Sequence, residues 1–302
     1  MSDFALQAAD LSKNYGKNAA IRSFTIDIPY GGLIGLIGRN GSGKTTFMKL
    51  CAGLLDLSGG KLEVFGRAPL DNLAVLSDLV YTCHNMSHEK QLRLQAILGN
   101  YAIIFKDFDR EFAEKLLQYF DLKPKMRYKQ LSQGMASIFN FICALACRSK
   151  LTMFDEPVLG MDVTVRKAAY EVLLRDYTEY PRTVIISSHL LAEMEGILSD
   201  ILLIDEGRPV LFGNIDDLRQ SSYRIEGEKA AVDSFSAGKQ IIYYKNGISC
   251  DAVIKETLDD EIRTRAGQSG LSVSHVRPED LCIYLTRENK EGELECLWQK
   301  TN

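Results

Sequence analysis

A glycine-rich segment between an apolar run and a helix-like run strongly limits what this chain can fold into. Residues 38–45 read Gly-Arg-Asn-Gly-Ser-Gly-Lys-Thr, which fits the pattern GxxxxGK[ST]. Leu33–Ile37 comes directly before it as a short, wholly apolar strand, and a helix is expected from Lys44 onward. Glycines let the backbone turn its N–H groups toward phosphate oxygens, and a helix start adds the positive end of its dipole. The segment therefore predicts a phosphate-binding loop in an α/β domain.

The side chains of this loop have distinct expected contacts with a nucleoside triphosphate. Lys44 would reach the β- and γ-phosphates, and the Thr45 hydroxyl would bind Mg²⁺. Thr46 would add a contact nearer the α-phosphate. ATP and Mg²⁺ are therefore the expected ligands. The predicted nucleotide-binding residues of the loop are Gly38, Asn40, Gly41, Ser42, Gly43, Lys44, Thr45 and Thr46.

Two adjacent carboxylates follow another apolar run. Leu151–Phe154 is expected as a buried strand, and Asp155, Glu156 and Pro157 end it. Both carboxylates would emerge at the C-terminal edge of the sheet, where α/β sheets bind ligands. An Asp-Glu pair after a strand is often only a solvated turn, but the loop upstream favours a catalytic role. Asp155 is then expected to bind Mg²⁺, and Glu156 to orient or deprotonate the attacking water.

The pattern of apolar residues, and with it the expected secondary structure, changes twice along the chain. Thr183–Ser187 and Ile201–Ile204 are further continuous apolar runs, which are typical of buried parallel strands. Residues 87–148 instead carry apolar residues at helical spacing, which predicts an inserted helical subdomain. From about residue 220 the order β-α-β-β-α-β is expected, which predicts a small ferredoxin-like domain.

Composition narrows the classes of partner. The 302 residues carry a formal net charge of -4, which argues against a general nucleic-acid-binding protein. No stretch approaches the ~20 apolar residues that cross a bilayer, and the N-terminal residues show no signal peptide. The seven cysteines form no CxxC pair, which suits a reducing cytoplasm. Any role at a membrane is therefore expected to go through a partner protein.

Taken together, these segments resemble the ATP-binding subunits of ABC (ATP-binding cassette) transporters, over about Leu6 to Leu218. Residues 131–135, Leu-Ser-Gln-Gly-Met, stand at the place of the family's LSGGQ signature. Residues 158–162 resemble the D-loop, and residues 187–189 end in a histidine placed as the family's switch histidine. Tyr15 stands where the family stacks an aromatic ring on adenine.

The resemblance implies a fold and a division into domains. The fold would be α/β, a P-loop NTPase of the ABC type with an inserted helical subdomain at about 87–148. Residues 1–219 would form the ABC ATPase domain, and residues 220–302 a small accessory α+β domain.

The resemblance also implies a mechanism that two subunits share. The family pairs subunits head to tail, so Ser132 and the Gly134 N–H would contact the γ-phosphate of the partner's ATP. Asp162 of the D-loop would also lie at the nucleotide. Glu156 and His189 would be the catalytic residues, with His189 holding the attacking water and Glu156 in line. Closure of the dimer around ATP would then drive transport.

Some positions depart from the family pattern. His84 stands where the family has a glutamine whose hard carbonyl oxygen reaches Mg²⁺, and imidazole is a softer ligand. Either His84 binds the metal or couples to a partner differently from the family's glutamine, or it has no functional role in the loop. Gln133 and Met135 replace glycine and glutamine in the signature, but the contacts expected there come from Ser132 and Gly134.

The leading hypothesis is the ATPase subunit of an exporter, which docks on separate transmembrane permease subunits. It would lie in the cytoplasm, peripherally on the cytoplasmic face of the cell membrane, and pair with the same or a different ATPase subunit. The signature and the C-terminal appendage resemble bacterial drug, bacteriocin or peptide exporters. Alternatives are a soluble ABC ATPase acting on a macromolecular complex, and an importer subunit. A GTPase or kinase is disfavoured, because no Asn-Lys-x-Asp segment occurs and the signature would go unexplained.

Overall fold

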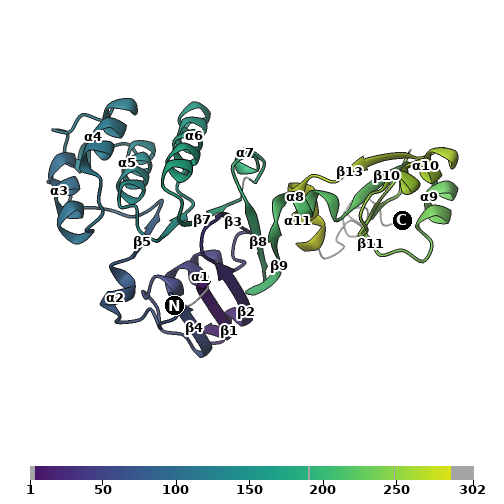
Figure 1. The fold of residues 1–302 in the computed structure, drawn as a ribbon, viewed down its shortest axis with the longest axis horizontal. Coiled ribbons are helices and arrows are strands. Elements are labelled where there is room, and N and C mark those ends of the chain that lie inside the picture. The colour runs from purple at the N-terminus through teal and green to yellow at the C-terminus, as the bar shows by residue number, and fades with distance from the viewer. Residues whose placement is uncertain (1–3, 190, 248, 287–302) are drawn as a thin grey trace, which may run out of the picture. The chain divides into compact units, whose positions relative to one another are not determined.

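The computed structural model describes residues 4–189, 191–247 and 249–286 (Figure 1). The chain divides into two compact units, Met1–Phe212 and Gly213–Asn302. The first three residues of the segment searched for a signal peptide lie outside the described residues, as do residues 287–302 of the expected accessory domain. The assignment of separate roles on either side of residue 219 stays a prediction.

A six-stranded sheet forms the centre of the first unit, in the order β5-β6-β7-β3-β8-β9. The pairs β5–β6, β6–β7, β3–β7 and β3–β8 are parallel. The apolar runs predicted as buried parallel strands are confirmed as β3, β6, β7 and β8. The strands are β3 (Leu33–Ile37), β5 (Leu79–Cys83), β6 (Leu151–Asp155), β7 (Thr183–Ser188), β8 (Asp200–Asp205) and β9 (Arg208–Asn214).

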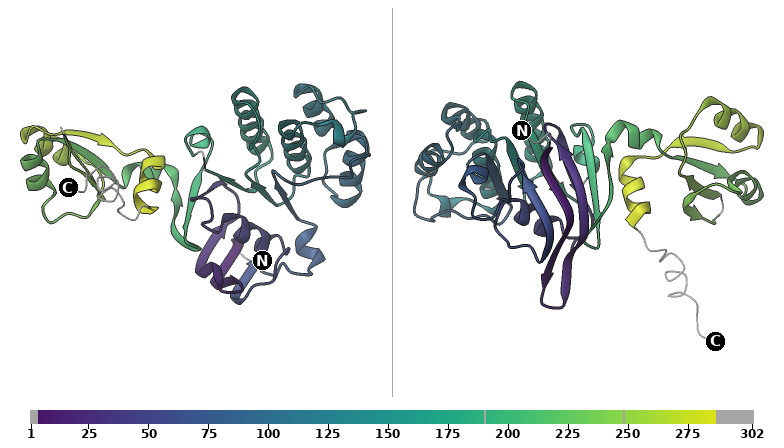
Figure 2. Two further views of the ribbon diagram at one scale, coloured as in Figure 1. Left: turned by 180° about the vertical axis from the view of Figure 1, so that it is seen from behind. Right: turned by 60° about the horizontal axis from the view of Figure 1, so that its bottom comes forward.

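A second, antiparallel sheet of three strands was not predicted. Its order is β2-β1-β4, with β1 (Phe4–Tyr15), β2 (Asn18–Pro29) and β4 (Gly59–Val64). Figure 2 shows β1 and β2 as a long hairpin. Helix α1 (Lys44–Cys51) lies between the two sheets, because its buried side chains share one apolar core with residues of both. This packing fixes the start of α1, and with it the phosphate-binding loop.

The inserted helical subdomain is present in the first unit. Its main helices are α3 (Leu94–Ile104), α4 (Arg110–Tyr119) and α5 (Gln133–Ala146), preceded by the short α2 (Leu73–Leu76) and joined by η1 (Tyr128–Gln130). Helix α6 (Val163–Glu179) and the short α7 (Leu191–Met194) follow β6 and β7. Among the described residues, no helix is long and apolar enough to cross a membrane.

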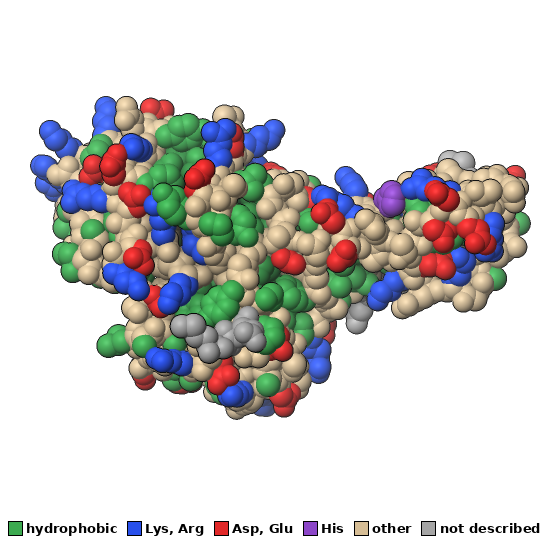
Figure 3. Space-filling model, in the orientation of Figure 1, with side chains coloured by type: hydrophobic (Ala, Val, Ile, Leu, Met, Phe, Trp, Pro, Cys, Tyr) green, Lys and Arg blue, Asp and Glu red, His purple; other side chains and the backbone are tan. Residues whose placement is uncertain are grey.

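The second unit is an α+β domain, as expected. Its four-stranded sheet has the order β11-β12-β10-β13, and all its neighbouring strands are antiparallel. The β-α-β-β-α-β order expected for a ferredoxin-like domain is confirmed. Its elements are α8 (Ile215–Gln220), β10 (Tyr223–Gly227), α9 (Lys229–Ser236), β11 (Ile241–Lys245), β12 (Cys250–Ile254), α10 (Asp260–Gln268), β13 (Ser272–His275) and α11 (Pro278–Thr286). On the face shown in Figure 3, acidic and basic side chains are interspersed over both units.

Candidate nucleotide-binding site

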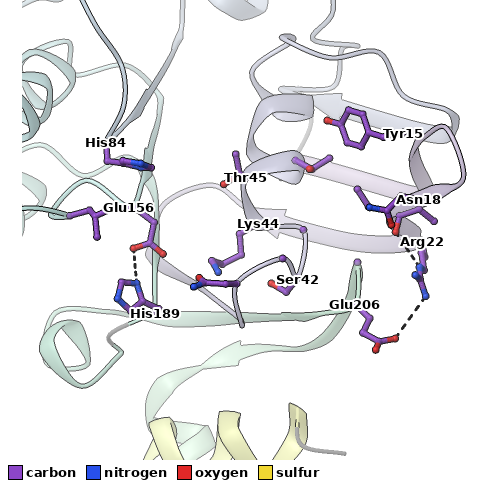
Figure 4. Close-up of a pocket in the computed structure, with 18 residues that line it drawn as sticks. Tyr15, Asn18, Arg22, Ser42, Lys44, Thr45, His84, Glu156, His189 and Glu206 are labelled. Atoms are coloured by element: carbon purple, nitrogen blue, oxygen red, sulfur yellow. Dashed lines mark hydrogen bonds and ion pairs between the residues drawn. The ribbon is translucent and has the colours of Figure 1, made fainter.

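A pocket of about 700 Å³ opens at the C-terminal edge of the central sheet, above the start of α1 (Figure 4). Most of the residues predicted to bind nucleotide or to catalyse hydrolysis line this one pocket, although they come from five separate stretches of sequence. Those lining residues are Tyr15, Asn40, Gly41, Ser42, Gly43, Lys44, Thr45, Thr46, His84, Glu156 and His189.

The conformation of the loop depends on glycine at position 43. Gly43 has φ +110° and is the N-cap of α1. A Cβ atom there would lie 2.7 Å from the carbonyl oxygen of Ala20, so both the backbone angle and the close approach require glycine. The loop thus presents the N-terminus of α1 to the pocket, where backbone N–H groups attract anions.

Lys44 is buried within the loop that it follows. Its ammonium donates hydrogen bonds to the carbonyl oxygens of Gly38, at 2.7 Å, and Arg39, at 3.2 Å. Burial lowers the pKa of Lys44, while the negative charges of Glu156 and Asp155 act in the opposite direction. The Ser42 hydroxyl is also buried and has no hydrogen-bond partner among the described residues. A positive charge and an unsatisfied hydroxyl at one place suit a phosphate group.

Asp155 lies at the end of β6 and is almost fully buried. Its Oδ1 accepts a hydrogen bond from the Ser187 hydroxyl, at 2.7 Å, and its Oδ2 accepts one from the Tyr81 hydroxyl, at 3.1 Å. The Ser187 oxygen in turn accepts the backbone N–H of Glu156, at 2.9 Å. Tyr81 and Ser187 were not predicted as site residues. These two side chains lie on β5 and β7, the strands on either side of β6, and they hold the Asp155 carboxylate in place.

Glu156 and His189 meet at the edge of the pocket. The Nδ1 atom of His189 lies 3.0 Å from Oε2 of Glu156. An ionised carboxylate only accepts hydrogen bonds, so with Glu156 in that form Nδ1 of His189 is the donor. Glu156 also has φ +50°, a conformation that costs free energy in a non-glycine residue and is common at functional sites. The side chain of Glu156 is only 15% exposed, so its orientation is well constrained.

His84 lines the same pocket, just after β5. Its backbone N–H donates to the carbonyl oxygen of Asp155, at 3.2 Å. Its Nδ1 atom is buried and has no hydrogen-bond partner among the described residues. Figure 4 shows the imidazole directed into the pocket toward Thr45.

The base-binding end predicted for the pocket carries residues that the sequence did not indicate. Tyr15 is 48% exposed, and the ammonium of Lys13 lies 5.3 Å from the centre of its ring. Asn18, Arg22 and Glu206 also line the pocket, and Arg22 forms an ion pair with Glu206 at 3.8 Å. Arg22 and Glu206 lie on or beside strands far apart in sequence, and only the tertiary fold brings them together.

The signature and D-loop residues predicted to contact nucleotide do not line this pocket. Ser132, Gly134 and Asp162 line a separate pocket of about 580 Å³. Ser132 caps α5 by accepting one backbone N–H, and Asp162 caps α6 by accepting two. A Cβ atom at Gly134 would lie 2.6 Å from the carbonyl oxygen of Gly160, so this glycine also lets α5 approach the D-loop closely.

Comparison with known proteins agrees with this geometry. Residues 21–159 match the family model described as ABC transporter. This chain contains an ABC transporter ATP-binding domain. It is similar to the ABC transporter ATP-binding protein YtrB of Bacillus subtilis (24% identical, covering 73% of this chain and 76% of that one). It is also similar to the bacitracin transport ATP-binding protein BcrA of Enterococcus faecalis (27% identical, 72% of each chain). A solved ATP-binding subunit of an ABC transporter aligns with a TM-score of 0.63 (26% identical, covering 71% of this chain and 92% of that one).

The ATP-binding domain offers oxygen ligands that fit Mg²⁺. The Thr45 hydroxyl and the Asp155 carboxylate are hard donors of the kind that this ion prefers. Among the described residues, no three His, Cys, Asp or Glu side chains are grouped so that they could hold a metal ion. The described residues therefore do not form a complete metal site by themselves, and an ion would need nucleotide phosphates as further ligands.

Proposed function

We propose that this chain hydrolyses ATP as the motor subunit of an ABC exporter, in a dimer whose two sites each use both subunits. The observation that carries the proposal is the contact between Glu156 and His189 at the edge of the pocket that holds Lys44. A phosphate-binding loop alone would support binding. A constrained carboxylate beside it supports hydrolysis.

In this mechanism the loop and Lys44 bind the phosphates of ATP, and Tyr15 stacks on the adenine. Glu156 orients the attacking water or accepts its proton. His189 holds Glu156 in place and contacts the γ-phosphate. Bound Mg²⁺, with Thr45 and Asp155 as its protein ligands, would neutralise phosphate charge. Most of the catalysis then comes from positioning and from charge stabilisation.

The separation of two groups of residues supports a shared site. Ser132, Gly134 and Asp162 line one pocket, and Lys44 and Glu156 line another. If Ser132 and Gly134 act on ATP, they act on the nucleotide of a partner subunit, which is a second copy or a related ATPase. The start of α5, which Ser132 caps, would place its N-terminal dipole on the γ-phosphate there.

The transported substrate would pass through separate permease subunits, which would hold this chain on the cytoplasmic face of the membrane. Similar proteins include ones named for export and for import. We propose export because of the Leu-Ser-Gln-Gly-Met signature and the α+β domain that follows the ATP-binding domain.

The test is purification of the chain together with its membrane partners from its own host, followed by reconstitution in vesicles. We expect co-purification with a membrane protein of several spans, ATP hydrolysis, and ATP-driven movement of substrate out of the cytoplasmic side. Lys44→Ala should abolish the hydrolysis and the movement. A chain that releases no phosphate from ATP, with or without its partners, would contradict the proposal.

A further inference from the structure

We infer that His84 binds the divalent cation that enters with ATP, and that it makes this site favour imidazole-binding cations such as Mn²⁺ or Co²⁺ over Mg²⁺. The inference rests on the proposed function, because the nucleotide supplies the remaining ligands. It concerns a residue that departs from the family's pattern, where a glutamine is usual.

The position of His84 brings it to the other oxygen ligands. It follows β5, which pairs in parallel with β6 so that Cys83 lies opposite Asp155. The His84 backbone N–H donates a hydrogen bond to the Asp155 carbonyl oxygen, with 3.2 Å between the nitrogen and the oxygen. The imidazole points into the pocket toward Thr45 (Figure 4). His84 is thus next to one expected ligand and directed at the other.

An unsatisfied nitrogen marks the imidazole as available. The Nδ1 atom of His84 is buried, and no described residue forms a hydrogen bond with it. A buried polar atom without a partner costs free energy, so its presence beside a ligand pocket needs an explanation. Coordination of a cation that enters the pocket with ATP would provide one.

The other histidine of the pocket is already engaged. Nδ1 of His189 contacts Glu156 at 3.0 Å. His88, four residues after His84, does not line the pocket; its Nε2 lies 3.1 Å from Oδ1 of Asn140. Of these three histidines, His84 is therefore the one with a buried ring nitrogen that has no hydrogen-bond partner among the described residues.

The donor atoms determine the cation. A glutamine would supply a carbonyl oxygen, which is a hard ligand suited to Mg²⁺. An imidazole nitrogen is softer, and first-row transition ions bind it better than Mg²⁺ does. With the Thr45 hydroxyl and the Asp155 carboxylate, His84 would complete a mixed oxygen and nitrogen set. Mg²⁺ can still bind through the oxygens, but it gains little from the imidazole.

Pulsed EPR of bound Mn²⁺ tests this directly. The full chain carries four histidines, so it can be labelled with ¹⁵N in histidine alone. The Glu156→Gln background keeps ATP intact. We expect a ¹⁵N coupling typical of a coordinated imidazole when Mn²⁺ and ATP are bound. It should be lost in His84→Gln and retained in the matched control His189→Gln.

A binding titration provides a second readout that does not depend on turnover. The ratio of ATP affinity with Mn²⁺ to that with Mg²⁺ should fall by about tenfold or more in His84→Gln, the scale of effect seen when a metal's ligand environment is altered. If Mn²⁺ and ATP bind but the ¹⁵N coupling is absent or survives in His84→Gln, the inference is wrong and ATP binding stands. If Mn²⁺ and ATP do not bind at all, the proposed function fails as well.

Discussion

The Nδ1 atom of His189 lies 3.0 Å from Oε2 of Glu156, although the two residues follow different strands. The contact is possible because β6 and β7 are neighbours and pair Asp155 with Ser187. Ser187 then bonds both Asp155 and the backbone of Glu156, which sets the turn from which Glu156 projects. A catalytic carboxylate held on two sides would lose little entropy when it orients a water molecule.

Glu156→Gln should therefore lower steady-state ATP hydrolysis by about 10²- to 10⁴-fold, the range for loss of a general base. ATP binding should persist, because the phosphate-binding loop and Asp155 are unchanged. The variant should also accumulate as an ATP-bound dimer, which light scattering would detect. Turnover close to that of the wild type would exclude Glu156 as the catalytic carboxylate.

Lys44→Ala should lose ATP affinity, because its charged hydrogen bonds to phosphate disappear from a buried position. A loss of at least about tenfold is expected from the strength of such bonds. Lys49→Ala is the matched control, since Lys49 lies on the same helix but does not line the pocket. Equal ATP affinities for the two variants in a fluorescence titration would refute the role of Lys44.

Tyr15→Ala should weaken ATP binding by about 1–3 kcal/mol, the range for stacking of a base on an aromatic ring. GTP binding should weaken similarly, because stacking does not distinguish base edges. Tyr30→Ala removes a comparably exposed tyrosine outside the pocket and should leave both affinities unchanged. If Tyr15→Ala behaves like Tyr30→Ala, Tyr15 is only a residue of the hairpin.

His88 should make the stability of the protein depend on pH. Burial lowers the pKa of His88, whose ring lies against Tyr128 and Phe139, while its hydrogen bond to Asn140 acts in the opposite direction. Below the ordinary histidine pKa of about 6.5, the unfolded chain therefore takes up the proton first. Stability is lost as pH falls through this range and is fully present above it.

His88→Gln should accordingly lose less stability than the wild type between neutral and mildly acidic pH. Glutamine can keep the hydrogen bond to Asn140 but does not titrate. Urea unfolding at several pH values would measure the difference. If the free energy of unfolding changes equally with pH in the two proteins, His88 does not contribute to the acid sensitivity.

The local parts of the site could be predicted from sequence. The residue types from Gly38 to Thr45 by themselves indicate the conformation of the loop. The buried strands before the loop and before Asp155 are continuous apolar runs. Short-range signals of this kind depend on neighbours in the chain. They indicate where a turn or strand lies without any knowledge of the tertiary fold.

The missed parts depend on pairing between distant segments. The pairing of β1 with β4 joins residues 47 to 58 positions apart, such as Leu6 with Val64, and nothing local specifies that partner. The roles of Tyr81 and Ser187 follow from the register of β5, β6 and β7, which a single apolar run does not fix. The close contact of Gly134 with Gly160 likewise arises only after α5 packs on the D-loop.

Mixing two inactive variants tests the shared-site account most directly. Lys44→Ala damages the site of its own subunit, and Ser132→Arg places a bulky cation where the account puts the partner's γ-phosphate. A mixed dimer has one site with both Lys44 and Ser132 intact, so phosphate release from the mixture should exceed that of either variant alone. If the mixture is no more active than the separate variants, although subunit exchange is shown by differently labelled chains, hydrolysis does not use a site built from both subunits.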